Sequence, residues 1–237
     1  MYRQDLTDIL NNWVTALKFP CTIYTVTAID ANNWTLGISD IYHLMVGYEV
    51  TNGANTYTIT AINATATPSP TITVTGTVAP VAQTSLGIYS PIFAHGTVRE
   101  TQAENVQTVS PFKQPVIWLE EGFTEKFYND PESVLERESQ ICLYFLCNAD
   151  FNQTTEQLYE SVVQPMQRLK QNFINYIDTY GTKPPVDKWE QTDKDRNYYK
   201  LGVFIKGKGM PKGLFSDQLS GISCDLNLVL YVPNPPC

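Results

Sequence analysis

The sequence predicts an α+β protein with a small all-β module inserted near its start, and three observations support this. Residues 21–93 contain no Lys or Arg and consist of alternating runs rich in Thr, Val, Ile and Asn. One amphipathic segment precedes this stretch, and a charged, aromatic-rich segment of mixed helix and strand follows it. We therefore expect a discontinuous α+β core domain, residues 1–20 with 94–237, and an inserted β-barrel domain, residues 21–93.

Composition limits the class of protein. A hydrophobic content of 43% and a charged content of 17% are typical of a folded globular chain. The net charge of −8 argues against nonspecific binding to DNA or to an anionic membrane. No run reaches the roughly 20 apolar residues of a membrane span. Because the N-terminus also lacks the pattern of a signal peptide, we expect the chain to stay in the cytosol where it is made.

The first element is a predicted helix over residues 3–17, ended by Pro20. Its apolar residues recur at helical spacing and form one stripe: Leu6, Ile9, Leu10, Trp13, Val14 and Leu17. A lone helix of about 15 residues is marginal in water. We therefore expect it to pack on the C-terminal sheet.

The inserted stretch predicts about five short strands separated by turn residues such as Asn52-Gly53 and by Pro68 and Pro70. A small barrel or SH3-like roll protects the edges of such strands.

The rest of the chain begins with a polar arm from residue 95. The sequence after this arm predicts a buried strand at 115–119, a short helical turn at 130–137 and a long central strand at 138–150. Residues 188–209 predict a strand pair with a polar turn, and residues 221–232 predict the last strand.

Residues 154–178 predict the main helix. Thr154 or Thr155 is suited to cap it, and Gly181 to end it. Pro165 falls inside the pattern, so we expect a kink or break there, because proline removes one backbone donor and clashes with the preceding turn.

The sequence shows no catalytic constellation. Its two histidines, His43 and His95, lack metal-ligand spacing, and no GxSxG motif is present. The five cysteines are odd in number and include no CxxC pair, which favours buried free thiols. We predict no catalytic, cofactor-binding or metal-binding residues and no cofactor. An enzyme would require an apolar pocket around His43 or His95.

Candidate interface residues come from two patterns. Six basic residues fall between Lys194 and Lys212, and in so acidic a chain they favour an acidic partner surface over nucleic acid. The glycine-rich run at 207–213 lacks the phosphate-loop pattern and predicts a surface loop. Two tyrosines are adjacent on a predicted strand, so one faces away from the core. With residues of the polar arm, the candidates are Tyr198, Tyr199, Lys206, Lys208, Lys212, His95 and Arg99.

Four short motifs carry a resemblance to a known family: FAHGT at 93–97, PVIWLE at 115–120, Pro165-Met166 and LSG at 219–221. With these motifs the chain resembles virion proteins of tailed bacteriophages, particularly crAss-like phages. The C-terminal order of elements also resembles the tail-terminator and neck-ring fold of long-tailed phages. The chain departs from a minimal tail terminator in carrying the β-module after its first helix.

The resemblance implies a structural subunit of the phage neck or tail top that acts by shape. Such subunits form homo-oligomeric rings, sixfold or twelvefold, around the DNA channel, and they contact portal, neck or tail proteins. DNA would pass through without specific binding, and the subunit would assemble into the virion in the host cytoplasm. The arm from His95 to Phe112 would then lie across a neighbour.

A carbohydrate- or host-binding module of a virion is the alternative, because a roll rich in Thr, Asn and Tyr also makes an adhesive surface. Trp34, Tyr48 and Tyr57 would be its stacking residues.

Overall fold

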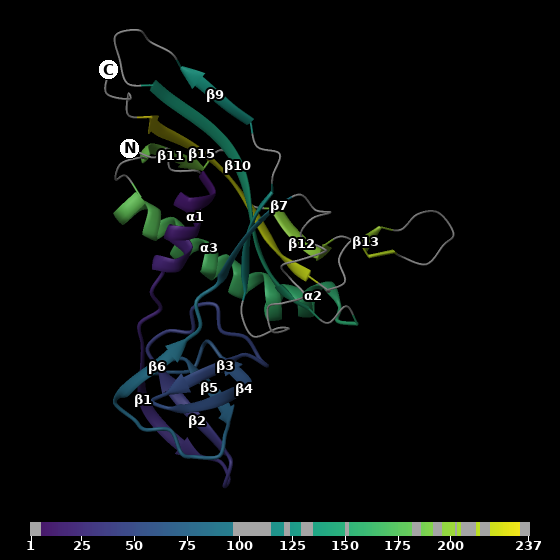
Figure 1. The fold of residues 1–237 in the computed structure, drawn as a ribbon. Coiled ribbons are helices and arrows are strands. Elements are labelled where there is room, and N and C mark those ends of the chain that lie inside the picture. Colours follow the sequence, from purple (N-terminus) through teal and green to yellow (C-terminus); the bar gives the residue numbers. More distant parts are fainter. Residues whose placement is uncertain are drawn as a thin grey trace.

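The structure is a computed structural model that describes residues 6–96, 115–120, 124–128, 135–149, 152–181, 186–191, 196–201, 203–204, 212–213 and 219–232. It contains a closed six-stranded antiparallel barrel and a seven-stranded sheet with helices packed against it (Figure 1). The predicted α+β class and the predicted barrel are both confirmed.

The barrel follows the first helix. Its strands are β1 (Cys21–Ala28), β2 (Asn33–Ile38), β3 (Glu49–Asn52), β4 (Asn55–Asn63), β5 (Thr71–Thr75) and β6 (Thr84–Ile88). Their order is β1-β2-β5-β4-β3-β6, and pairing of β1 with β6 closes the ring. The sequence predicted about five strands, and the closed barrel has six. Closure leaves no free sheet edge in this part of the molecule.

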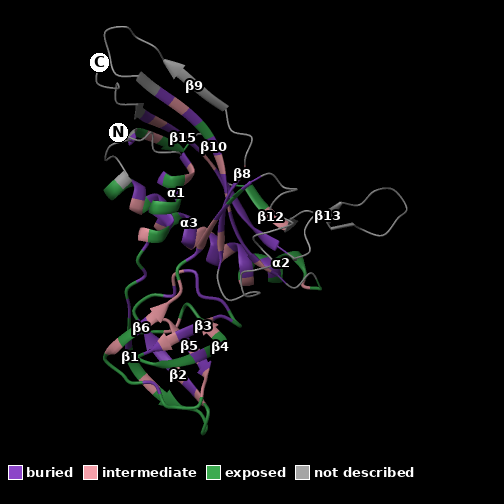
Figure 2. Cartoon of the chain, in the orientation of Figure 1, coloured by how far each residue is buried: buried purple, intermediate pink, exposed green. Residues whose placement is uncertain are grey.

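Alternation along the strands fills the barrel. Ile23, Leu36, Val50 and Ile72 are fully buried, while Thr side chains occupy most of the outward positions. Figure 2 shows this change from buried to exposed residues within single strands. The hydrophobic pattern therefore sets the register of the barrel.

Two long strands form the centre of the larger sheet. β10 (Leu135–Asn148) and β15 (Leu219–Val232) are antiparallel and pair over their whole length. On one side β10 pairs with β8 (Val116–Glu120) and β9 (Thr124–Tyr128), and β8 pairs in parallel with β7 (Ile92–Gly96). On the other side β15 pairs with β11 (Val186–Gln191) and β12 (Arg196–Leu201). A separate two-stranded ladder joins β13 (Val203–Phe204) and β14 (Lys212–Gly213).

Three local predictions need correction. β11 and β12 are both strands, but they lie in tandem along β15 and do not pair with each other. Residues 135–137, predicted as part of a helical turn, begin β10, and residues 131–134 lie outside the described part of the chain. Ile92 and Phe93, assigned to the insert from composition, pair with β8 in the larger sheet. In each case the pairing with a strand distant in sequence decides the outcome, and the local pattern of residues does not predict that pairing.

Helices cover one face of the larger sheet. α1 (Leu6–Ala16) lies beside a continuous helical stretch made of α2 (Thr155–Leu158), η1 (Tyr159–Val163), α3 (Gln164–Tyr176) and η2 (Ile177–Gly181). All six residues of the predicted stripe of the first helix are buried, and Trp13 meets Phe173 edge-on with ring centroids 6.3 Å apart. The first helix was expected to pack on the C-terminal sheet; it packs on the main helix α3 and on β7, the edge strand of the larger sheet.

Pro165 does not break the main helix. A π-helical turn, η1, precedes it, and the N–H of Gln164 donates to the carbonyl of Tyr159 five residues back. The proline therefore sits at the start of the following α-helix, where its missing N–H is tolerated. The predicted irregularity is present as a change of helix type.

Candidate functional site

The loop between β2 and β3, residues 39–48, joins the barrel to the core and is called the junction loop below. Its apolar residues Ile41, Leu44, Met45 and Tyr48 are buried. Tyr42 adopts a positive φ of 38°, a conformation uncommon for a residue with a side chain. Its N–H donates to Asp40 Oδ1 at 2.9 Å and its hydroxyl to the Pro20 carbonyl at 2.9 Å, and these bonds hold the conformation.

His43 lies at the centre of this junction. Its Nε2 is 3.0 Å from the Tyr89 carbonyl oxygen, and its ring packs edge-on against Phe19 with centroids 4.5 Å apart. Phe19 precedes the first barrel strand and Tyr89 follows the last, so His43 touches both chain crossings between barrel and core. Burial lowers the pKa of His43 to about 4, although the hydrogen bond to Tyr89 acts in the opposite direction. The ring is therefore neutral at pH 7 and packs as an apolar group with one polar contact.

Tyr48 continues the junction into the sheet. Its hydroxyl lies next to the thiol of Cys147 on β10, and burial raises the pKa of Cys147 to about 12. Burial also raises the pKa of Tyr48 far above its ordinary value. Both groups are protonated at neutral pH, and among the described residues the Tyr48 hydroxyl has no hydrogen-bond partner. They fill space between barrel and sheet and carry no charge.

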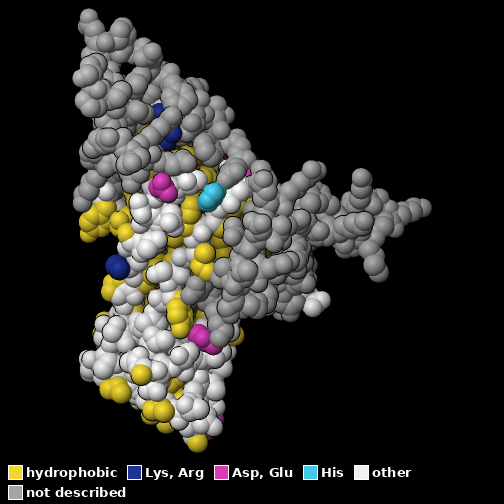
Figure 3. Space-filling view, viewed as in Figure 1, with side chains coloured by type: hydrophobic (Ala, Val, Ile, Leu, Met, Phe, Trp, Pro, Cys, Tyr) yellow, Lys and Arg dark blue, Asp and Glu magenta, His cyan; other side chains and the backbone are white. Residues whose placement is uncertain are grey.

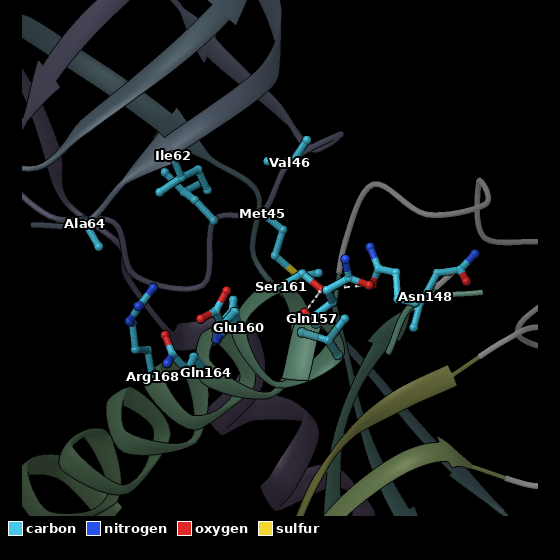
Figure 4. A pocket seen from close by; sticks show the side chains of 15 residues that line it. Met45, Val46, Ile62, Ala64, Asn148, Gln157, Glu160, Ser161, Gln164 and Arg168 are labelled. Carbon is cyan, nitrogen blue, oxygen red and sulfur yellow. Dashed lines mark hydrogen bonds between the residues drawn. The ribbon is translucent and has the colours of Figure 1, made fainter. Parts of the chain in front are cut away.

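A cleft of about 710 Å³ opens beside the junction, between the barrel and the first half of the main helix (Figure 4). The barrel contributes an apolar wall that includes Met45, Val46 and Ile62. The helix contributes a polar wall. The remaining lining residues are Leu44, Ala64, Asn148, Ala149, Gln153, Gln157, Glu160, Ser161, Val162, Gln164, Pro165 and Arg168. The two walls thus come from segments more than 80 residues apart in sequence.

A capping box builds the helical wall. The N–H of Thr154 donates to Gln157 Oε1 at 2.9 Å, and the N–H of Gln157 donates to Thr154 Oγ1 at 3.3 Å. The Ser161 hydroxyl lies 2.7 Å from the Gln157 backbone carbonyl oxygen and 3.1 Å from Gln153 Oε1, and its single proton can be donated to one of them. Because the side-chain oxygen of Gln157 accepts the bond from Thr154, the NH₂ group of Gln157 is left as a donor on this wall.

Charge is sparse in the cleft. Glu160 and Arg168 are its only ionisable lining residues among those the structure describes. Partial burial lowers the pKa of the Arg168 guanidinium, and the nearby carboxylate of Asp40 acts against this shift. An arginine nevertheless keeps its charge at neutral pH. The two ionisable side chains have opposite signs, so the cleft is close to neutral.

The sheet face opposite the helices carries a row of aromatic residues. Trp118 and Tyr144 lie 5.0 Å apart between ring centroids, and Tyr144 and Tyr198 lie 5.3 Å apart. β15 lies between the strands that carry Tyr144 and Tyr198; its Ser223 is paired with Tyr144 and its Gly221 with Tyr198. The Tyr144 hydroxyl donates to Glu120 Oε2 at 2.9 Å, and burial is the main cause that raises the pKa of Tyr144. We call Trp118, Tyr144 and Tyr198 the aromatic row.

The candidate residues named from sequence are dispersed. Tyr198 joins the aromatic row, whereas its neighbour Tyr199 packs against the main core on the other face, as strand alternation predicts. His95 is exposed on β7, with its ring 6.0 Å from that of Phe93. Lys212 lies on β14, and its side chain is not described. Lys206, Lys208 and Arg99 lie outside the described residues.

The prediction of buried free thiols can be checked for the described cysteines. Cys21, Cys147 and Cys224 are buried free thiols, Cys142 is half-buried and free, and Cys237 lies outside the described residues. Where the structure describes the chain, no group of three or more His, Cys, Asp or Glu residues is placed to hold a metal ion. No described helix has both the length and the apolar character needed to cross a membrane.

Sequence reasoning missed the cleft. Val46 and Gln164 belong to no recognisable motif, and only the fold brings them to one site. The single available signal was Pro165, which predicted an irregular helix at the place where the cleft lies.

These observations define an α+β protein with an inserted six-stranded barrel that packs against its core. No family model matches the chain, and no curated protein matches it.

Proposed function

We propose that this protein is a structural subunit of a ring in the neck or tail connector of a tailed bacteriophage. The motifs FAHGT, PVIWLE and LSG and the order of elements support the proposal through their resemblance to neck-ring and tail-terminator proteins. The ring would form around the DNA channel, and the subunit would act by assembly rather than turnover.

The aromatic row is the observation that carries the proposal. Helices α1 and α3 lie on one face of the sheet, and the row lies on the other, where Tyr144 and Tyr198 remain partly exposed. Arg196 and Asp225 flank it, with 3.7 Å between the guanidinium nitrogen and the carboxylate oxygen. Aromatic residues bordered by paired charges are typical of protein interfaces. In a ring each subunit would present this face to its neighbour in a head-to-tail contact.

Analytical ultracentrifugation and single-particle electron microscopy of the purified chain test the proposal. We expect concentration-dependent closed rings of sixfold or twelvefold symmetry. Tyr198→Ser should weaken ring formation at least tenfold, whereas Tyr180→Ser, which alters an exposed tyrosine at the end of the main helix, should leave it unchanged. A strict monomer that also fails to bind purified portal or tail proteins would refute the proposal.

The structure weakens the alternative of carbohydrate binding by the barrel. Trp34, Tyr48 and Tyr57 are all buried, so none of them can stack on a sugar ring. We accordingly expect the chain to bind no glycan on an array.

A further inference from the structure

A head-to-tail ring needs two different surfaces on each subunit, because one surface of a subunit meets another surface of its neighbour. The aromatic row supplies only one of them. Among the described residues, the exposed large hydrophobic side chains are the candidates for the second surface: Tyr24, Ile29, Val46, Val78, Val81, Tyr159 and Tyr180. Five of these seven belong to the barrel and its junction loop, so most of the remaining apolar surface lies there.

Four of the exposed residues lie on adjoining segments of the barrel, and we call them the barrel patch: Tyr24 in β1, Ile29 in the turn between β1 and β2, and Val78 and Val81 in the loop between β5 and β6. Hydrogen bonds hold these segments together. The N–H of Gln83 donates to the Ile23 carbonyl at 2.7 Å, and its side-chain NH₂ donates to the Tyr24 carbonyl at 2.9 Å. At the other end of the loop, the N–H of Gly76 donates to the Asn32 carbonyl at 3.0 Å. The loop therefore runs alongside the second half of β1.

The barrel patch extends to the end of the barrel that lies away from the core. β2 runs from the β1–β2 turn to the junction loop, so this turn and the junction loop lie at opposite ends of the strand. Asn33 at the start of β2 pairs with Thr75 at the end of β5, and the loop after β5 therefore begins at the same end as the turn. Figure 3 shows hydrophobic side chains on this end of the barrel. The contact between barrel and core does not cover them.

A buried asparagine fixes the loop that carries half of the barrel patch. Asn52 is 5% exposed, and its Oδ1 accepts a hydrogen bond from the N–H of Val81 at 2.9 Å. Its Nδ2 donates to Thr84 Oγ1 at 2.7 Å and to the Ser85 carbonyl at 3.0 Å. The Thr84 hydroxyl donates to the Val81 carbonyl at 2.5 Å. Because the loop is already ordered by these bonds, it loses little conformational entropy when it binds a partner.

Charge distinguishes between the possible partner surfaces. The segments that carry the barrel patch contain one charged residue, the exposed Asp30 of the β1–β2 turn, and no basic residue. Contact between two barrel patches would therefore bring carboxylates together with no cation between them. At the aromatic row the side chain of Arg196 is 61% exposed, against 27% for its partner Asp225. The carboxylate of Glu120, also beside the row, accepts the hydrogen bond of the Tyr144 hydroxyl. The most exposed charge of the flanking pair is thus a cation, which complements Asp30.

We infer that the barrel patch of one subunit docks on the aromatic row of a second copy of this chain. The aliphatic side chains of the patch would pack on the partly exposed rings of Tyr144 and Tyr198. The inference rests on the proposed ring and specifies the two surfaces that meet at each of its contacts. One surface lies on the barrel and the other on the larger sheet, so the contact is head-to-tail.

Substitutions in the barrel patch test the inference, with ring formation by the full-length chain measured by analytical ultracentrifugation. Val81→Asp places a carboxylate inside the apolar contact and should weaken ring formation at least tenfold. Val78→Asp repeats the test at a second position of the same loop and should have the same effect. The matched control is Val46→Asp, because Val46 is 61% exposed against 59% for Val81 but lies in the junction loop beside the cleft. It should change ring formation less than twofold.

Mixing two defective variants shows which surfaces meet. Val81→Asp retains an intact aromatic row, and Tyr198→Ser retains an intact barrel patch. At a concentration at which the wild type forms rings, each variant alone should be monomeric. An equal mixture should give a heterodimer, because one intact contact can form between the two variants and neither can extend it further.

Circular dichroism would first establish that the variants fold. Undiminished rings of Val81→Asp and Val78→Asp would overturn the inference and leave the ring proposal standing. A dimer of either variant alone would also overturn it, because the contacts would then join patch to patch and row to row, as would a mixture that stays monomeric. A wild-type chain that forms no ring would overturn the inference together with the ring proposal.

Discussion

Protonation of His43 should destabilise the junction between barrel and core. The ring is buried to 1% exposure and hydrogen-bonded through one nitrogen only, so a positive charge there would have little compensation. Burial lowers its pKa in the folded protein to about 4, against a value of 6.5 for an unperturbed histidine. Between these two pH values the unfolded chain holds the proton more tightly than the folded chain.

The sign and size of the effect follow from this difference. The stability that depends on neutral His43 is fully present above pH 6.5 and is lost as the pH falls through about 4. At pH 5 the loss is about 2 kcal/mol, and below pH 4 it approaches about 3 kcal/mol, from 1.36 kcal/mol per pKa unit.

Urea denaturation at pH 7, 6 and 5 measures the effect in the wild-type chain and in His43→Gln. Carboxylates also titrate at the lower end of this range, in both proteins. The effect of His43 is therefore the difference between the two proteins in the free energy of unfolding lost from pH 7 to pH 5. The wild type should lose about 2 kcal/mol more than His43→Gln between pH 7 and pH 5. His95→Gln makes the same substitution at the other histidine, which is exposed on β7, and is the matched control. Equal pH slopes for His43→Gln and the wild type would refute the reasoning.

Three further predictions concern single side chains, each checked by the free energy of unfolding. Gly221→Ala should destabilise by about 3 kcal/mol or more, because the added Cβ would fall 1.9 Å from the Phe145 carbonyl oxygen; a loss below about 0.5 kcal/mol would show that the strands can separate there. Tyr48→Phe removes an unpaired buried hydroxyl and should leave the stability unchanged or raise it by about 1 kcal/mol. Tyr42→Phe removes a hydrogen bond and should lower the stability by about 1 kcal/mol. A larger loss of stability from Tyr48→Phe than from Tyr42→Phe would contradict these hydrogen-bond assignments. Thr154→Ala should cost about 1 kcal/mol through loss of the capping box, and an unchanged stability would show that the cap contributes nothing.

The parts of the fold that could be predicted from sequence are those governed by local periodicity. The stripe from Leu6 to Leu17 and the alternation from Ile222 to Leu230 both gave the correct element and the correct buried face. Thr154 or Thr155 was expected as the cap, and Thr154 is the cap; such a prediction is possible because the requirements of a helix start lie within a few residues.

Pairing partners could not be predicted in this way. The order β1-β2-β5-β4-β3-β6 depends on contacts between distant segments, as does the tandem placement of β11 and β12 along β15. The cleft is likewise a product of tertiary structure: Val46 and Gln164 meet because the junction loop packs against the main helix. The sequence likewise did not identify Phe19 and Tyr89 as the partners of His43 at the junction.

The charges of the barrel bear on how it would act in the proposed ring. Residues 21–93 hold three acidic residues, Asp30, Asp40 and Glu49, and no basic ones, while the whole chain carries −8. Like charges repel, so contacts between identical barrels in the proposed ring would avoid these three carboxylates. The exposed apolar residues Tyr24 and Val81 lie on the barrel surface, and Figure 3 shows other hydrophobic side chains spread over it. In the proposed ring, contacts through the barrel would therefore use this apolar surface between the carboxylates.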